Sequence, residues 1–268
     1  MDGPLPVADC VDLKEQRIGW LIHVFTSLGI MAGFFGVVSV LDHSPRAALL
    51  WMMAAMIIDG LDGPIARRYD VGRVVPQIDG NSLDLMIDYV TCVVAPALFI
   101  HEFFLLPHRY NISLVGVFLI LTSSLYVMAN TNIQTPDKYF TVFPAMWSLV
   151  ANVLFVLQSR QWVNVVVIGI FVIVSFVPVM FIHPIRVADF RRITIPVLIV
   201  WLAAIIYATW VIGGEPSRLA EGLPTGVEIA QLLIYVGAFW ILGVGIWRTF
   251  HGPSQHAVQA PVTGRYFG

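Results

Sequence analysis

Charged side chains are scarce in this chain: only 12% of its 268 residues are Asp, Glu, Lys or Arg. A soluble domain carries about twice that share. No polar stretch is long enough to form a separate soluble domain, and no basic tract indicates a nucleic-acid partner. The composition therefore excludes an ordinary soluble enzyme and a nucleic-acid-binding protein, and the net charge of −2 does not point to any other partner.

Cysteine is also rare, and a secretory signal peptide is missing. The two cysteines are Cys10 in the polar N-terminus and Cys92 in an apolar run, so we expect two free thiols. The stretch from Met1 to Gln16 carries four acidic residues before Arg17, unlike the positively charged start of a signal peptide. We therefore expect the first apolar span to be retained.

Apolar sequence, by contrast, is abundant: 58% of the residues are hydrophobic. Runs long enough to cross a bilayer recur along the whole chain, and a helix satisfies its own backbone there. We expect an all-α polytopic membrane protein with about eight transmembrane helices (18–247), between a cytoplasmic N-terminal segment (1–17) and a cytoplasmic tail (248–268). The predicted spans are Ile18–Leu41, Ala47–Ala66, Ser82–Leu105, Ile112–Ala129, Phe140–Leu157, Val163–Ile182, Ile193–Ile212 and Val227–Trp247.

The distribution of basic residues predicts the orientation of the bundle. With both termini on one side, that side collects Lys14, Arg17, Arg67, Arg68, Arg73, Lys138, Arg186, Arg191, Arg192, Arg248 and Arg265. The opposite side receives only Arg46, Arg109, Arg160 and Arg218. Because basic loops stay in the cytoplasm, we expect both termini to be cytoplasmic.

Four aspartates interrupt the apolar pattern in the second and third spans. Asp59 and Asp62 are three residues apart and Asp84 and Asp88 are four apart, so each pair projects from one face of its helix. Both pairs lie up to roughly 10 Å inside the membrane, where ionisable groups are costly and indicate function. Four hard oxygen donors converging from antiparallel helices suit divalent cations. Three other aspartates are more typical of helix caps or solvated positions: Asp70, Asp79 and Asp137.

Small residues and an arginine flank the four aspartates. Gly63, Ala66 and Gly80 lack the larger side chains that would keep a nucleotide away from the backbone. Arg67 offers a planar fork of donors for phosphate oxygens. A site sunken below the membrane surface suits a lipid with a nucleotide head better than a water-soluble substrate alone.

The spacing Asp-x2-Asp-Gly-x2-Ala-Arg, followed by Gly-x3-Asp-x3-Asp, resembles the signature of the CDP-alcohol phosphatidyltransferases, and all of its fixed residues are present. The resemblance implies an integral membrane enzyme that moves a phosphatidyl group from CDP-diacylglycerol to an alcohol and releases CMP. It also implies two Mg²⁺ or Mn²⁺ ions on Asp59, Asp62, Asp84 and Asp88, with Asp88 taking the proton of the acceptor hydroxyl. The implied contacts to the CDP-lipid are Gly63, Ala66, Arg67, Gly80, His23 and Thr26.

Other segments resemble the bacterial members of that family that use choline and make phosphatidylcholine, and this resemblance implies a bacterial inner membrane. These segments are His23–Gly29, Asp88–Val90, Tyr139–Phe140 with Phe143–Pro144 and Trp147, Trp162–Asn164, and Phe176–Pro178 running to His183–Arg186. Twelve residues separate Arg67 from Gly80, a longer insert than is common in the family. The resemblance covers roughly residues 17 to 192, where Ser148 replaces an expected Asn and Asn130–Pro136 is atypical. A quaternary ammonium cannot donate hydrogen bonds, so aromatic faces would hold choline. The candidates are Tyr89, Tyr126, Tyr139, Phe143 and Trp147.

Two alternatives stay open on the sequence alone. The same chemistry could serve another acceptor, such as serine, glycerol phosphate or an inositol, although phosphorylated acceptors would favour more basic residues. A cation transporter could also use the aspartates, but the spans show no obvious internal repeat. Membrane lipids are expected neighbours, and a homodimer is an open alternative to a monomer.

Overall fold

The protein is described here by a computed structural model covering residues 12–130, 135, 139–182, 187, 190–214 and 223–252. Most of the two predicted terminal segments lies outside the described residues. So do several residues named in the sequence analysis, including Cys10, Asp137, Lys138, Arg186, Arg218 and Arg265. In the described residues the regular structure is helical, apart from one isolated β-bridge. The predicted all-α architecture is confirmed.

Among the described residues, six helices are long and apolar enough to cross a membrane. The third of them is continuous from Gly80 to Glu102 and changes helix type twice, and the fourth begins with a short 3₁₀ turn. The six are α1 (Leu13–Leu41), α2 (Pro45–Arg68), α4–η1–α5 (Gly80–Asp88, Tyr89–Val94, Ala95–Glu102), η2–α6 (Arg109–Asn111, Ile112–Ala129), α9 (Arg191–Ile212) and α10 (Thr225–His251). A one-turn helix, α3 (Val71–Val74), lies between α2 and α4.

The other two predicted spans contain shorter apolar helices, α7 (Trp147–Val156) and α8 (Gln161–Val174). The fifth predicted span therefore starts with non-helical chain at Phe140–Met146, and the sixth ends with non-helical chain after Val174. Pro144 and Pro178 lie in these stretches, where a proline removes a backbone donor. The count of eight membrane crossings stays a prediction.

The two non-helical stretches pair with each other. The backbone amide of Phe140 donates to the carbonyl of Phe181 (2.9 Å), and the amide of Phe181 donates to the carbonyl of Phe140 (2.8 Å). α10 packs closely against the second stretch: the Met180 amide donates to the Thr249 hydroxyl at 2.9 Å. A side chain at Gly245 would clash with the Met180 carbonyl, so this close approach requires glycine.

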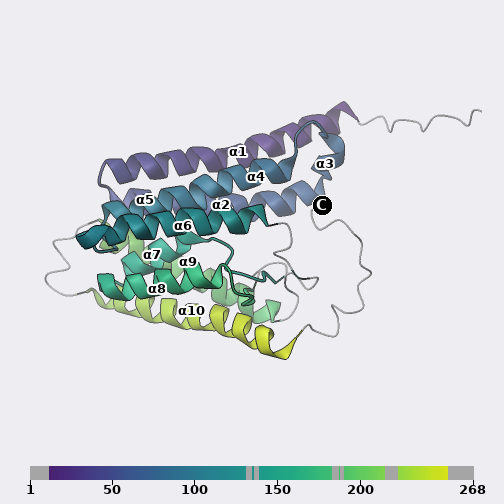
Figure 1. The fold of residues 1–268 in the computed structure, drawn as a ribbon. Coiled ribbons are helices and arrows are strands. Elements are labelled where there is room, and N and C mark those ends of the chain that lie inside the picture. The colour runs from purple at the N-terminus through teal and green to yellow at the C-terminus, as the bar shows by residue number, and fades with distance from the viewer. Residues whose placement is uncertain are drawn as a thin grey trace, which may run out of the picture.

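The helices lie side by side in one bundle (Figure 1). The start of α1 and the end of α10 lie at the same end of the bundle, together with α3 (Figure 1). The turn that joins α2 to α4 is therefore at this end, which the basic residues predict to be cytoplasmic.

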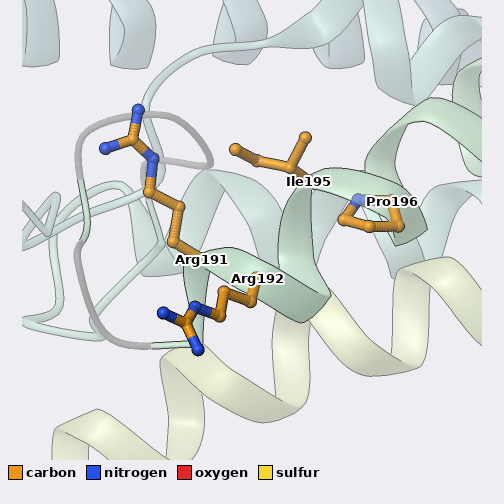
Figure 2. A pocket seen from close by; sticks show the side chains of 4 residues that line it. All are labelled: Arg191, Arg192, Ile195 and Pro196. Carbon is orange, nitrogen blue, oxygen red and sulfur yellow. The ribbon is translucent and has the colours of Figure 1, made fainter.

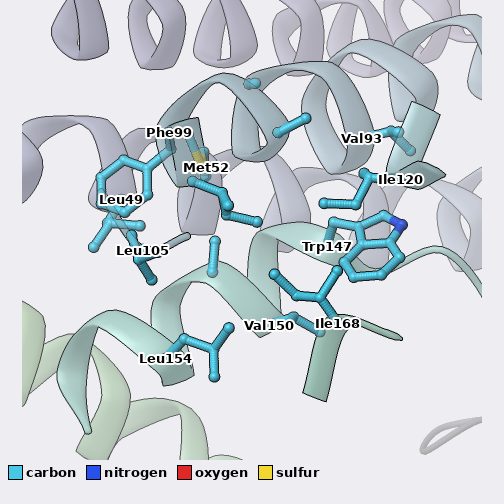
Figure 3. Packing of buried hydrophobic residues seen from close by; sticks show 14 of the residues in the cluster. Leu49, Met52, Val93, Phe99, Leu105, Ile120, Trp147, Val150, Leu154 and Ile168 are labelled. Carbon is cyan, nitrogen blue, oxygen red and sulfur yellow. The ribbon is translucent and has the colours of Figure 1, made fainter. Parts of the chain in front are cut away.

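A core of apolar side chains from α1, α2, the third long helix, α6, α7 and α8 holds the bundle together (Figure 3). Trp147 is fully buried within it, and the indole N–H donates to the Ser124 hydroxyl at 2.7 Å. A second cluster joins α7 to α9 and α10. These contacts fix the helices that carry the four aspartates.

Candidate functional site

The start of α4 is defined by Asp79, which acts as its N-cap. The Asp79 carboxylate accepts the amide of Asn81 at 3.1 Å and the Ser82 hydroxyl. The bond from Ser82, together with the amides of Asn81 and Ser82, lowers the pKa of Asp79. Asp70 occupies the N-cap position of α3 and pairs with Arg73 at 2.9 Å. These two aspartates are structural, as the sequence predicts, and the cap fixes where the next aspartates of α4 lie.

Three of the four predicted metal ligands converge between α2 and the third long helix. One carboxylate oxygen from each of Asp59, Asp84 and Asp88 lies within 4.8 Å of the other two, and all three residues are half-buried. Three carboxylates this close repel one another strongly unless cations or protons intervene. The arrangement can therefore hold a positive ion.

Asp88 lies one turn further along the third long helix than Asp84. One of its carboxylate oxygens, Oδ1, is buried and has no hydrogen-bond partner among the described residues. The charges of Asp59, Asp84 and Asp62 all act on this carboxyl group. A buried carboxylate oxygen without a donor is costly, and hard oxygen ligands are what Mg²⁺ and Mn²⁺ prefer. The donor set therefore fits a divalent cation.

Asp62 lies outside this group of three and faces α1. The side chain is buried, and its carboxylate interacts with the hydroxyl of Thr26, the backbone amide of Gly63 and the guanidinium of Arg67. A Cβ at Gly63 would lie 3.2 Å from a guanidinium nitrogen of Arg67, so the missing side chain leaves room for the arginine. Of the predicted CDP-lipid contacts, Thr26, Gly63 and Arg67 thus surround one aspartate.

His23 and Gly80 also lie together. A Cβ at Gly80 would be 3.6 Å from Cε1 of the His23 ring, so α1 contacts the start of α4 here. The Nε2 atom of His23 is buried and has no hydrogen-bond partner within the described part of the chain. Ala66 is half-buried on α2, one residue before Arg67. The His23 Nε2 atom therefore has no competing hydrogen bond within the described residues.

The five aromatic residues predicted to hold choline lie in different surroundings. The rings of Phe143 and Trp147 are buried and meet edge to face, with centroids 5.1 Å apart. Tyr139 is fully buried, and the guanidinium of Arg248 lies 5.4 Å from its ring centroid. The hydroxyl of Tyr89 donates to the Leu121 carbonyl at 3.2 Å. Tyr126 is exposed and packs against Phe176. Their role in choline binding stays a prediction.

An open hollow of about 550 Å³ lies at the start of α9. It is lined by Arg191, Arg192, Ile195 and Pro196 (Figure 2). Both arginines are exposed, in keeping with the basic residues expected at a cytoplasmic helix end.

Sequence reasoning noted Ser148 only as a departure from the resemblance and did not predict its contact with the segment that follows Asp88. A π-helical segment, Tyr89–Val94, follows Asp88 directly, and the fully buried Ser148 donates its hydroxyl to the Thr91 carbonyl at 2.7 Å. The signal available in the sequence is Pro96, which removes a backbone donor in the third span. A proline alone does not predict which side chain compensates.

Comparison with known proteins identifies relatives over nearly the whole chain. The sequence model of the CDP-alcohol phosphatidyltransferase family matches residues 21–177. The phosphatidylcholine synthase of Pseudomonas aeruginosa is 34% identical over 245 residues, covering 91% of this chain and 98% of that protein. That of Borreliella burgdorferi is 32% identical over 87% of this chain and 95% of its own length. That of Rhizobium meliloti is 32% identical, with shares of 81% and 88%.

Proposed function

Because the chain belongs to the CDP-alcohol phosphatidyltransferase family, which catalyses phosphatidyl transfer to an alcohol, we propose that it transfers the phosphatidyl group of CDP-diacylglycerol to choline. The products would be phosphatidylcholine and CMP. Membership of an enzyme family speaks against the cation-transporter alternative. The protein is an integral membrane protein, and we place its site on the cytoplasmic face of a bacterial inner membrane on the distribution of Lys and Arg.

The observation that carries the proposal is the convergence of Asp59, Asp84 and Asp88 within 4.8 Å of one another. They belong to the spacing that resembles the family signature, and they come from two helices that are separate in the sequence. A structural cap or a solvated side chain would not need two partners of the same charge.

Two divalent cations fit this donor set. Asp59, Asp84 and Asp88, with Asp62 beside them, would hold Mg²⁺ or Mn²⁺, and the unpartnered Oδ1 of Asp88 supports a ligand role. When bound, the ions would neutralise the pyrophosphate and stabilise the charge that develops on departing CMP.

The protein's own residues would bind and orient the nucleotide lipid. Arg67 is exposed beside Gly63 and can donate to phosphate oxygens. The buried Nε2 of His23, next to Gly80, can bond the nucleotide, and Thr26 orients the Asp62 carboxylate. Ala66 and Gly80 leave the backbone accessible.

The transfer itself would be a direct displacement at the phosphorus that carries diacylglycerol. The choline oxygen forms a bond to this phosphorus, the bond from phosphorus to the CMP oxygen breaks, and CMP leaves with the electron pair. Asp88 accepts the proton of the choline hydroxyl. No Ser, Cys or His belongs to the group of carboxylates, so a covalent enzyme intermediate is not required.

Choline is the acceptor that the relatives' names favour, and serine is the alternative. The test is an assay of purified protein with CDP-diacylglycerol and a panel of labelled alcohols. Lipid formation from choline and release of CMP would support the proposal. If serine reacts readily and choline does not, the choline assignment is wrong, while phosphatidyl transfer stands.

A further inference from the structure

The π-helix after Asp88 determines where the last two aspartates point. Tyr89–Val94 adopts this wider form, and the amide of Ala95 bonds the carbonyl of Val90, five residues back. Such segments are rare and are frequent at functional sites. Inserting one residue into a turn rotates everything before it by about 100° relative to a continuous α-helix. The directions of Asp84 and Asp88 relative to α5 therefore depend on this segment.

The π-helix lacks a donor at its next position. In the same pattern the carbonyl of Thr91 would accept the amide of residue 96, but residue 96 is proline and has no N–H. Thr91 is buried in the bundle, where an unsatisfied carbonyl is costly. The hydroxyl of Ser148 on α7 supplies a bond to this carbonyl at 2.7 Å.

Ser148 is itself held by a chain of buried hydrogen bonds. Its carbonyl accepts the side-chain amide of Asn152 at 2.9 Å, and the Asn152 oxygen accepts the hydroxyl of Thr209 on α9 at 3.3 Å. On the other side of Thr91, α1 comes so close that a Cβ at Gly33 would clash with the Thr91 methyl group. The turn after Asp88 is thus fixed between α1 and α7.

We propose that Ser148 is a positioning residue for the phosphatidyl transfer. By donating to the Thr91 carbonyl it holds the π-helix that Pro96 leaves incomplete, and it thereby directs Asp84 and Asp88 toward Asp59. This inference rests on the proposed function, because it takes Asp88 as the base and as a cation ligand. Removal of groups that orient metal ligands costs roughly 10- to 100-fold in metal affinity or activity.

The experiment compares Ser148→Ala with wild type in purified protein. We expect kcat to fall by roughly 10-fold or more, with a smaller change in KM for CDP-diacylglycerol, because Ser148 is fully buried and acts through the Thr91 carbonyl. Binding of Mn²⁺ without substrate, measured by electron paramagnetic resonance of the free ion, should weaken in parallel. Ser39→Ala is the matched control: Ser39 is also buried and donates to a backbone carbonyl, that of Phe35, at 2.7 Å.

A second pair of variants separates the hydroxyl from packing. Ser148→Thr keeps the donor and Ser148→Val removes it at nearly the same volume, so Thr should retain far more turnover and Mn²⁺ affinity than Val. Equal behaviour of this pair, or wild-type turnover and Mn²⁺ affinity in Ser148→Ala, overturns the inference. Asp88→Asn distinguishes failure of the proposed active site from failure of the positioning role of Ser148. If Asp88→Asn stays active, the proposed active site is wrong as well. If Asp88→Asn is inactive while Ser148→Ala is normal, only the positioning role is wrong.

Discussion

Removal of one carboxylate from the aspartate group should stabilise the metal-free protein while it abolishes activity. Asp59, Asp84 and Asp88 present oxygens within 4.8 Å of one another. At an effective dielectric constant of about 20, each ionised pair repels by about 3.5 kcal/mol. Asp59→Asn removes two of the three pairs, which is about 7 kcal/mol at this separation if all three carboxylates are ionised, and partial protonation reduces the relief. Even part of this should raise Tm, by roughly 2–4 °C per kcal/mol.

The assay is thermal unfolding in detergent, first with chelator and then with Mn²⁺. With chelator, Asp59→Asn should melt above wild type. With Mn²⁺ at about 100 times its Kd, wild type should gain about 2.7 kcal/mol and the variant much less. Asp70→Asn is the charge-matched control, because Asp70 is exposed and pairs only at the surface with Arg73. A metal-free Asp59→Asn that melts at or below wild type, or equal Mn²⁺ shifts in both, would refute the reasoning.

Other predictions test the site, the orientation and the packing. Replacement of any one of Asp59, Asp62, Asp84 and Asp88 by Asn, or addition of chelator, should remove nearly all turnover. Near wild-type turnover in Asp84→Asn would rule out the assignment of these aspartates as metal ligands. In protein lacking Cys10 and Cys92, a cysteine at the Arg73 position should be labelled from the cytoplasmic side of oriented vesicles, and labelling only from the other side contradicts the topology. If an aromatic ring holds the ammonium group of choline, replacing that ring by Leu should raise KM for choline a few-fold to tens-fold, because a cation–π contact contributes about 0.5–2 kcal/mol. The positions to test one at a time are Tyr89, Tyr126, Tyr139, Phe143 and Trp147. An equal rise in KM for CDP-diacylglycerol argues against a choline contact. Gly245→Ala should lower stability by about 1–3 kcal/mol through overpacking against Met180, and an unchanged Tm would show that α10 can move away.

The sequence predicts the helical bundle well because hydropathy and length are local properties. It does not predict where α7 starts or α8 ends. There the apolar pattern continues through Phe140–Met146 and beyond Val174, while the backbone leaves the helix. Pairing of Phe140 with Phe181 satisfies backbone groups that a helix would otherwise satisfy, and such a partner from a distant segment is invisible to a periodicity argument.

The geometry of the aspartate site could likewise be predicted from the sequence only in part. Helical spacing predicts that Asp84 and Asp88 share a face, because four residues leave an offset of only about 40°. Three residues leave about 60°, so Asp62 is turned away from Asp59 toward Thr26 on α1. The four carboxylates predicted to converge are thus three that lie together and one beside them. The π-helix after Asp88 contributes to this geometry, and it depends on Ser148, far away in the sequence.

The close packing of α10 on the non-helical chain near Met180 determines whether the protein can be shortened from its C-terminal end. The family match ends at residue 177, before α9 and α10, so this match alone gives no sign that the two helices are needed. Non-helical backbone cannot face hydrocarbon, however, and must be covered by protein or water. The amide of Met180 is satisfied by Thr249 of α10, and Arg248 covers the ring of Tyr139. A version that ends after Ile182, without α9 and α10, would therefore expose this stretch to lipid, and the part from α1 to α8 could not be excised as a self-sufficient unit.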